Sequence, residues 1–264
     1  MLYQINKNGP SSILELAAGP ARHSLTALSS PNSISNCHAV DLSTDMKAYA
    51  KEIAEEFLPD ADDPSFQYSI MDMSNLDATK IDVDDDVDVS EESIDSAWML
   101  LGSMQHLLTN SDAISTFQSI GSVVKTGGTL IIELPHPREL FQLMECTRNG
   151  WEIPLDLDGE EGSDEGELRV IWGDDEDVFD PILQQRQFTV ELKLVGKDKN
   201  GNEEVMQKVR EVVPMRLFTA QELDALASAS GCWQVEKMYG ALDEEIEIGD
   251  DDLAFRMVCV LRKI

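Results

Sequence analysis

The sequence is poor in positive charge. Its 264 residues include 20 lysines and arginines against 51 aspartates and glutamates, which gives a formal net charge of −31 at pH 7. A surface with this balance repels nucleic-acid phosphates and anionic lipid headgroups. We therefore expect neither nucleic acid nor a membrane among the partners of the chain.

Cysteine, histidine and long apolar runs are also scarce. The four cysteines and four histidines form no CxxC, HxH or HExxH pattern, which argues against the common zinc motifs and a disulfide framework. No apolar run approaches the roughly 20 residues that cross a bilayer. Residues 1–7 lack the apolar core of a secretory signal. We expect a cytoplasmic protein with buried free thiols and no transition-metal centre.

The acidic residues are concentrated in three stretches. Residues 82–92 hold seven acids, residues 150–180 hold thirteen and residues 243–252 hold seven, with a single base among them. Runs of this kind are typical of solvated loops. We predict an acidic loop over 74–93, a flexible acidic insertion over 150–181 and a third loop over 243–252.

Short apolar runs alternate with amphipathic stretches along most of the chain. Strands are predicted at 13–16, 36–41, 66–71, 94–100, 129–134, 232–238 and 253–261. Helical patterns separate several of them, and a strand–helix alternation is typical of a parallel sheet covered on both faces. We predict an α/β fold with a doubly wound, mostly parallel sheet of seven strands. The helix before the fifth strand is expected to end in a glycine turn at Lys125–Gly128.

A different pattern appears in the second half of the chain. Residues 187–195 alternate apolar and polar side chains, and residues 204–213 return after Asn200-Gly201. This is typical of an antiparallel hairpin, which we predict over 185–214. No clean boundary separates independent domains, so 1–264 is predicted to be a single domain. The hairpin, the acidic loop and the acidic insertion are expected to cover a substrate.

The stretch Ile13–Ala21 combines an apolar run with a turn of small residues, and a helical pattern follows. Strand, tight turn and helix direct backbone N–H groups toward a ligand, and Gly19 has no Cβ to hold a ligand away. The next strand ends at Asp41, at the spacing that places a carboxylate beside a bound ribose. An ordinary tight connection and a helix cap would explain the same residues without a ligand.

Taken in order, these features resemble the class I S-adenosylmethionine-dependent methyltransferases. The most similar branch has a first motif that reads E-L-A-C-G-T-G-R-H-S, which corresponds to Glu15–Ser24. The further matches are Asp41, Asp72-Met73, Leu101-Gly102-Ser103, Lys125–Gly128, Arg216–Thr219 and Gly231-Cys232-Trp233. The resemblance covers nearly the whole chain and implies a Rossmann-like methyltransferase fold.

The resemblance also implies a cofactor, S-adenosyl-L-methionine. Its implied contacts are Glu15, Ala17, Gly19, Arg22, Asp41, Leu42, Asp72, Met73 and Leu101. Asp41 would hold the ribose hydroxyls and Asp72 the adenine amino group, whereas a purely structural role remains open for Glu15 and Arg22. The chain departs from the family at Pro20-Ala21, which replace Thr-Gly. Proline removes an N–H there, and alanine adds a Cβ where the backbone approaches the cofactor most closely.

The implied reaction moves a methyl group to a nitrogen or oxygen of a small molecule by in-line displacement, which depends mainly on alignment. Candidate proton acceptors follow the fourth and fifth strands at His106, Glu133 and His136. Each has a structural alternative, as a helix cap, a sheet contact or a turn residue.

Two other functions stay open. One is a catalytically silent relative that serves as a binding or scaffold protein. The other is a nicotinamide-dependent reductase, although the sequence does not match the GxGxxG motif expected of such an enzyme.

Overall fold

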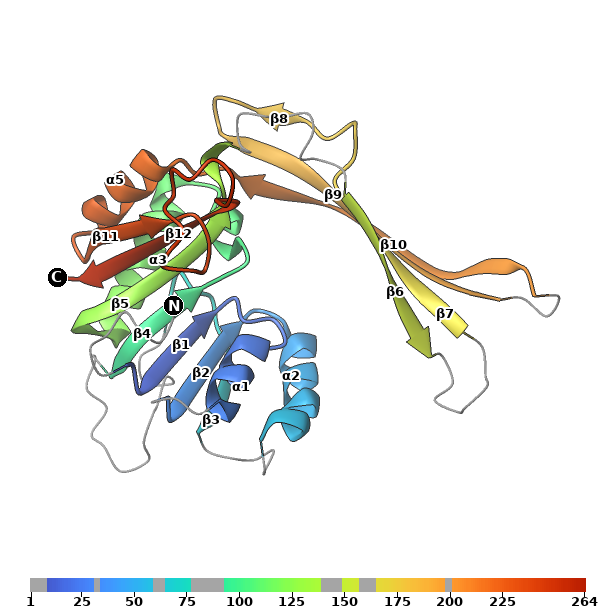
Figure 1. Ribbon diagram of the computed structural model, residues 1–264, viewed down its shortest axis with the longest axis horizontal. Helices are drawn as coiled ribbons and strands as arrows, with labels where there is room; N and C mark the ends of the chain where they lie inside the picture. The colour runs from blue at the N-terminus through green and yellow to red at the C-terminus, as the bar shows by residue number, and fades with distance from the viewer. Residues whose placement is uncertain are drawn as a thin grey trace. The chain divides into compact units, whose positions relative to one another are not determined.

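A computed structural model describes residues 9–30, 34–58, 65–76, 93–138, 149–156, 165–197 and 201–264. The chain divides into two units. The first, here called the α/β unit, comprises Met1–Pro137 and Phe218–Ile264, and the second, the β unit, comprises Arg138–Leu217. Figure 1 labels the helices and strands of both.

The α/β unit is built on one sheet of seven strands in the order β11-β12-β5-β4-β1-β2-β3. The strands are β1 (Ser12–Leu16), β2 (Asn36–Asp41), β3 (Phe66–Ile70), β4 (Ile94–Met99), β5 (Val124–Pro135), β11 (Trp233–Tyr239) and β12 (Arg256–Lys263). Strands β1 to β5 pair in parallel, and β12 runs antiparallel to both β5 and β11. The predicted doubly wound, mostly parallel sheet is confirmed.

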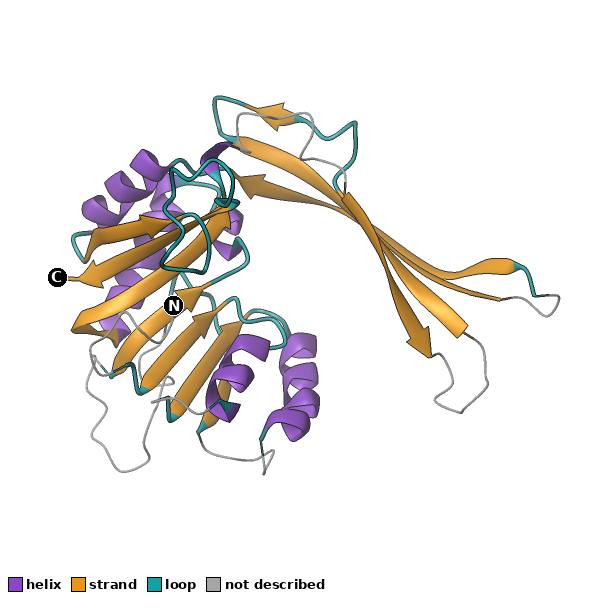
Figure 2. Ribbon diagram, viewed as in Figure 1, coloured by secondary structure: helices purple, strands orange, loops and turns teal. Residues whose placement is uncertain are grey.

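Helices cover both faces of this sheet (Figure 2). They are α1 (Arg22–Ser29), α2 (Thr44–Phe57), the 3-10 helix η2 (Ser103–His106), α3 (Asn110–Val123) and α5 (Ala220–Ser230). Every residue of β1 is buried. Leu14 packs in one core cluster with Phe117 of α3 and Leu223 of α5, whereas Ile13 packs in another with Ala27 of α1. Burial on both faces explains why these strands are continuous apolar runs in the sequence.

The predicted glycine turn at Lys125–Gly128 is wrong. Helix α3 ends at Val123, and the following residue, Val124, is extended and pairs with Ile94 of β4. The register between β4 and β5 then shifts, so that Ser96 pairs with Thr129. The two glycines therefore lie in an irregular segment of β5, after the helix has already ended.

The β unit is an antiparallel sheet in the order β10-β9-β7-β6, with β8 paired to β9. Its strands are β6 (Asn149–Asp156), β7 (Glu165–Trp172), β8 (Phe179–Asp180), β9 (Gln185–Lys197) and β10 (Glu203–Arg216). The hairpin predicted over 185–214 is confirmed as β9 and β10. The flexible insertion predicted over 150–181 is wrong in its described part, because β6 and β7 are formed there. Alternating apolar residues such as Trp151 and Ile153 outweigh the acidic composition.

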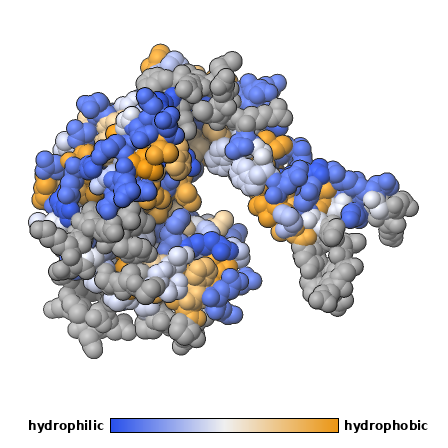
Figure 3. Space-filling model, viewed as in Figure 1, coloured by the Kyte–Doolittle hydropathy of each residue, from blue (hydrophilic) through white to orange (hydrophobic). Residues whose placement is uncertain are grey.

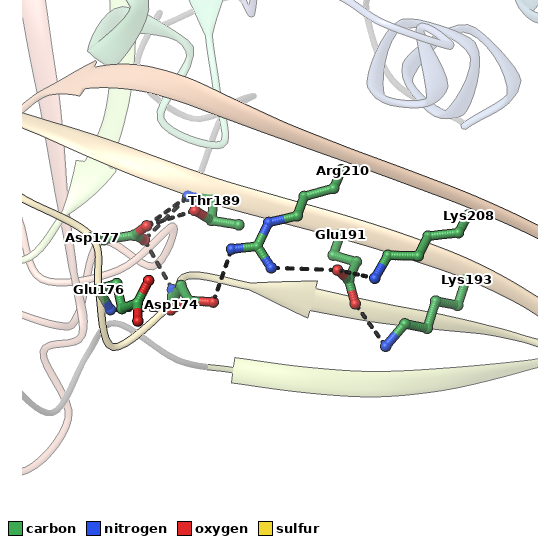
Figure 4. A network of polar contacts seen from close by, with 8 residues as sticks. All are labelled: Asp174, Glu176, Asp177, Thr189, Glu191, Lys193, Lys208 and Arg210. Atoms are coloured by element: carbon green, nitrogen blue, oxygen red, sulfur yellow. Dashed lines mark hydrogen bonds and ion pairs between the residues drawn. The ribbon is translucent and has the colours of Figure 1, made fainter.

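Charged side chains form a network on one face of β9 and β10 (Figure 4). Glu191, which is buried, lies 2.7 Å from Lys193 Nζ and 2.8 Å from Lys208 Nζ. Arg210 reaches Glu191 at 3.5 Å and Asp174 at 3.2 Å. Hydrogen bonds from Lys193 and Lys208 lower the pKa of Glu191 to about 2. Glu191 is therefore neutralised by bases on its own strand and on the neighbouring strand.

The remaining predictions concern loops and thiols. Residues 243–252 form turns and irregular structure, as predicted. The acidic loop over 74–93 lies outside the described residues except at its two ends. Cys37 and Cys259 are buried free thiols, and burial raises the pKa of both. Within the described ranges, no helix is long and apolar enough to cross a membrane, and no group of three or more His, Cys, Asp or Glu is arranged to hold a metal.

Candidate functional site

The carboxyl ends of the parallel strands meet at one edge of the α/β unit (Figure 1). From β1 the chain continues outward to β2 and β3 on one side, and β4 and β5 then lie on the other side of β1. The strand order therefore reverses beside β1. In open α/β sheets, ligands bind outside the carboxyl ends of the strands at such a reversal.

The turn after β1 has an unusual backbone. Ala17, Gly19 and Ala21 have φ values of 49°, 51° and 53°, in the left-handed region that residues other than glycine rarely adopt. The Ala18 N–H donates to the carbonyl of Val40 at 3.0 Å, and the Ala21 N–H donates to the carbonyl of Ala18 at 2.8 Å. A Cβ built on Gly19 would meet no atom within 4 Å, so the turn opens onto free space at this residue.

Asp41 ties this turn to the next helix. Its Oδ2 accepts a hydrogen bond from the Gly19 N–H and its Oδ1 accepts one from the Ser43 N–H, both at 2.9 Å. Ser43 is the residue that caps helix α2. A carboxylate oxygen can accept a second hydrogen bond, so Asp41 can hold the turn and still bind a hydroxyl group. Its side chain is partly exposed.

A cavity of about 490 Å³ lies at this edge. Its lining includes six of the residues that the sequence singled out: Ala17, Asp41, Leu42, Asp72, Met73 and His106. They come from the ends of three strands and from η2, so they are brought together only by the fold. Sites for small molecules usually have volumes of about 300–1,000 Å³, and this cavity falls within that range.

Four of the predicted cofactor contacts, Glu15, Gly19, Arg22 and Leu101, are not among the residues that line the cavity. Glu15 is 3% exposed, and its Oε2 accepts hydrogen bonds from the Ser24 N–H at 3.0 Å and the Ser24 hydroxyl at 2.6 Å. Arg22 is exposed at the start of α1. Leu101 is 70% exposed and has a φ of 54°. The contacts of Glu15 favour its structural alternative, which is to hold the start of α1 against β1.

The candidate proton acceptors differ in their surroundings. Glu133 is buried, and its two oxygens lie 3.0 Å from the Leu101 N and 3.2 Å from the Arg256 Nε. His136 is also buried, and its Nε2 lies 2.8 Å from the carbonyl oxygen of Ile248. His106 is exposed and lines the cavity. The catalytic roles of Glu133 and His136 stay predictions, and their contacts suit a structural role.

Several residues of the site carried no signal in the sequence. Ser74, Leu107 and Asp112 also line the cavity, as does Ser103 of the Leu101-Gly102-Ser103 match. Tyr68 is buried in β3, and its hydroxyl donates to the carbonyl of Gly19 at 2.7 Å. Burial raises the pKa of this phenol, and the nearby carboxylates of Asp41 and Glu15 raise it further. Tyr68 therefore stays protonated, and its hydrogen bond to the Gly19 carbonyl stabilises the turn.

The structure changes the expected effect of Ala21, one of the two residues at which the sequence departs from the family motif. Ala21 is fully buried and packs in a cluster with Ala39, Ala50 and Tyr68. Its Cβ lies in the core between the sheet and the helices, and Ala21 is not among the residues that line the cavity. The concern that this methyl group stands where the backbone approaches a cofactor is therefore not supported by the structure.

The ion pair between His23 and Glu15 predicts a pH dependence of stability. His23 Nδ1 lies 2.9 Å from Glu15 Oε1, and this hydrogen bond, opposed by partial burial, raises the pKa of His23. A raised pKa in the folded state means that the contribution to stability is complete below the unfolded pKa and is lost as pH rises through the folded pKa. The histidine is 39% exposed, so we expect less than about 1 kcal/mol.

This prediction can be checked with His23→Gln. The free energy of unfolding of the unchanged protein should exceed that of the variant by more at pH 6 than at pH 9, and denaturant titrations at both values measure the difference. A difference that is the same at both pH values would show that the pair does not titrate in this range.

The sequence matches no model of a protein family, and a search of curated proteins also found no match. Solved structures with a similar fold were found. An S-adenosylmethionine-dependent methyltransferase from Clostridium acetobutylicum has a TM-score of 0.63 at 16% identity, over 95% of this chain and 83% of that one. The sugar N-methyltransferase KedS8 from Streptoalloteichus has a TM-score of 0.62 at 16% identity, over 96% and 81%.

A third similar structure is CalS10 bound to S-adenosylmethionine, an amino pentose methyltransferase from Micromonospora echinaspora. Its TM-score is 0.59 at 15% identity, over 97% of this chain and 84% of that one. Identities this low establish a shared fold. The α/β unit thus has the Rossmann-like fold of these methyltransferases, with the antiparallel β12 between β5 and β11.

Proposed function

We propose that this chain is an S-adenosylmethionine-dependent methyltransferase that acts on a nitrogen or oxygen of a small molecule. The observation that carries the proposal is the convergence of Ala17, Asp41, Asp72 and Met73 on one cavity at the carboxyl edge of the sheet. This is the edge where the fold binds ligands. The similar structures named above support the same assignment.

The residues of the cavity suit the adenosine part of the cofactor. Asp41 can accept from the two ribose hydroxyls while it holds Gly19 and Ser43. Asp72 uses Oδ1 to accept from the N–H and the hydroxyl of Ser74. Among the described residues its Oδ2 has no hydrogen bond, which leaves that oxygen for an adenine amino group.

The apolar lining suits the flat face of a base. Leu42 is 70% exposed and Met73 is half-buried beside it in the lining of the cavity. An exposed leucine at a cavity rim gains free energy when an apolar surface covers it, at roughly 25 cal/mol per Å². We assign Leu42 and Met73 to the two sides of the adenine ring.

The methionine part would lie along the turn at Gly19, where a side chain is absent. When bound, the cofactor supplies an activated methyl group and departs as a neutral thioether. The chain itself has to hold the acceptor in line with the methyl carbon, which is worth about 7–11 kcal/mol of the barrier when alignment is complete. His106 faces the same cavity and would take the proton that the acceptor releases.

The charge of the chain favours an amine as the acceptor. A net charge of −31 attracts cationic amines and raises their local concentration. KedS8 is described as a sugar N-methyltransferase and CalS10 as an amino pentose methyltransferase, and both descriptions fit an amine. Amino sugars and related small amines are therefore the acceptors that we expect first.

The test is a transfer assay with methyl-labelled S-adenosylmethionine and a panel of small amines and alcohols. We expect a labelled product from at least one amine. His106→Phe should lower kcat by about 10²–10⁴-fold, as the loss of a general base does, and lower the affinity for S-adenosylhomocysteine by a much smaller factor. Binding of S-adenosylhomocysteine without methyl transfer to any acceptor would favour the catalytically silent binding protein. Binding of NADH instead would favour the reductase.

A further inference from the structure

The turn between β4 and η2 has a strained backbone. Two consecutive residues of this turn, Leu101 and Gly102, have φ values of 54° and 80°. A leucine in this left-handed region costs free energy, and the conformation persists only where the surrounding structure fixes it. The side chain of Leu101 is 70% exposed, so its packing does not supply that restraint. The restraint has to come from contacts of the backbone.

Glu133 of β5 supplies these contacts. Its main-chain carbonyl accepts a hydrogen bond from the Gly102 N–H at 3.0 Å, and its side-chain Oε2 accepts one from the Leu101 N–H at 3.0 Å. A single residue therefore holds both N–H groups of the turn. Glu133 is 4% exposed and is not among the residues that line the cavity, so its carboxylate contacts the turn and not the space of the cavity.

The second oxygen of this carboxylate is held by β12. Arg256 Nε lies 3.2 Å from Glu133 Oε1. In the antiparallel pairing of β5 and β12, Val258 lies opposite Glu133, and Arg256 is two residues further along β12, on the same face. A buried carboxylate needs a partner of opposite charge, and the guanidinium also fixes the orientation of the carboxylate. Nothing local in the sequence marks Arg256, because this contact depends on the strand pairing.

The turn determines where η2 places its side chains. Gly102 is the capping residue of η2, and its carbonyl accepts a hydrogen bond from the Gln105 N–H at 2.8 Å. A Cβ built on Gly102 would lie 2.7 Å from Gln105 Oε1, so the turn and η2 are closely packed. Met104 and Gln105 are buried, whereas His106 lines the cavity. A shift of the turn would therefore move the imidazole of His106.

We infer that Glu133 and Arg256 are positioning residues that act through His106. The inference rests on the proposed function, in which His106 takes the proton that the acceptor releases. Neither Glu133 nor Arg256 lines the cavity, so both act on the rate through the turn and η2. Their effect can be large, because a misplacement of about 1 Å can cost about a hundredfold in rate.

Glu133→Gln tests the inference with little change in shape. The carboxylate offers one acceptor oxygen to Leu101 and one to Arg256, whereas an amide has a single acceptor oxygen, so one contact is lost. In the transfer assay kcat should fall about tenfold, and about a hundredfold in Glu133→Ala. KM for S-adenosylmethionine should stay within about twofold. Arg256→Gln should lower kcat by less than Glu133→Gln, because the Leu101 N–H keeps its acceptor.

The ion pair of Glu236 with Arg262 provides a matched control. Arg262 Nη2 lies 2.6 Å from Glu236 Oε2, and Arg262 pairs with Thr129, away from the end of β5 that holds Glu133. Figure 3 shows many hydrophilic residues on the surface of the α/β unit, so the loss of one exposed charge there should be tolerated. Glu236→Gln should keep kcat within about twofold of the unchanged protein.

A double variant separates positioning from a general loss of stability. In a His106→Phe background, Glu133→Gln should lower kcat by no more than about twofold, because the group through which Glu133 acts is absent and the two effects are coupled. A purely structural defect would lower kcat by the same factor with and without His106, and that result overturns the inference.

Histidine NMR of the cofactor-free protein gives a readout that does not depend on methyl transfer. The chain has four histidines, and His106→Phe identifies the signal of His106. Glu133→Gln should shift or broaden this signal, and Glu236→Gln should leave it in place. An unchanged His106 signal in Glu133→Gln overturns the inference. A changed signal in a protein that transfers no methyl group supports the positioning and contradicts the proposed function alone.

Thermal unfolding shows whether each variant is folded. The side chain of Arg256 is 38% exposed, so Arg256→Gln removes a partner of Glu133 at a position that tolerates substitution. If Glu133→Gln does not fold, Arg256→Gln takes its place in the same NMR and kinetic comparisons, with the same outcomes for and against the inference.

Discussion

Asp41→Ala is expected to lower the affinity for S-adenosylhomocysteine at least about a hundredfold. The carboxylate holds the N–H groups of Gly19 and Ser43, each at 2.9 Å. Hydrogen bonds to a charged group are worth about 1.5–3 kcal/mol each, and about 2.7 kcal/mol corresponds to a hundredfold in affinity. The variant loses the anchor of the turn and, under the proposed function, the acceptor for the ribose hydroxyls.

Isothermal titration calorimetry measures this effect, and Asp45→Ala is the matched control. Asp45 is exposed in the first turn of α2 and does not line the cavity, so the same change in charge and size there should leave the affinity within about twofold, as surface substitutions usually do. Thermal unfolding shows whether both variants keep the fold. Equal affinities for Asp41→Ala and the unchanged protein would remove Asp41 from the cofactor site.

Glu15→Ala is expected to lower the free energy of unfolding by about 3–4 kcal/mol, because a buried charged partner of several donors is lost. The carboxylate is 3% exposed and accepts from the N–H and hydroxyl of Ser24 and lies against His23. Removing it leaves the Ser24 donors buried without a partner and separates α1 from β1. Denaturant titration at pH 7 measures the loss.

Two further variants separate the cause. Glu15→Gln keeps the shape and one acceptor oxygen, so its loss should be smaller, about 1–2 kcal/mol. Glu52→Ala on the exposed face of α2 should stay within about 0.5 kcal/mol, as surface substitutions usually do. If Glu15→Ala were as stable as Glu52→Ala but bound no cofactor, Glu15 would be a ligand contact and its structural role would be wrong.

The sheet of the α/β unit could be predicted from the sequence because its strands are buried on both faces. Ile13 and its neighbour Leu14 pack in two different core clusters, so both have to be apolar. The apolar runs are therefore continuous and easy to find. The β unit was harder. Its strands β6 and β7 carry acids on one face, and the composition of 150–180 concealed the two-residue period of Trp151 and Ile153.

The residues of the candidate site also differ in how well the sequence predicts them. Asp41 ends β2, Asp72 comes two residues after β3, and His106 lies in the short η2 that follows β4, so their position in the sequence predicted that they would meet at one edge. Tyr68 and Asp112 reach the site from the middle of a strand and from the first turn of a helix. Nothing local marks such residues, because their contacts depend on tertiary packing. Glu133 shows the converse, since a strand-end acid can be engaged entirely by the backbone and an arginine.

The most direct test is a crystal structure of the protein with S-adenosylhomocysteine. The ribose hydroxyls should lie within hydrogen-bonding distance of the Asp41 carboxylate, the adenine should lie between Leu42 and Met73 with its amino group at Asp72, and the homocysteine part should follow the turn at Gly19. A ligand bound elsewhere, or a cavity that stays empty at saturating ligand, would contradict the assignment of this edge as a cofactor site.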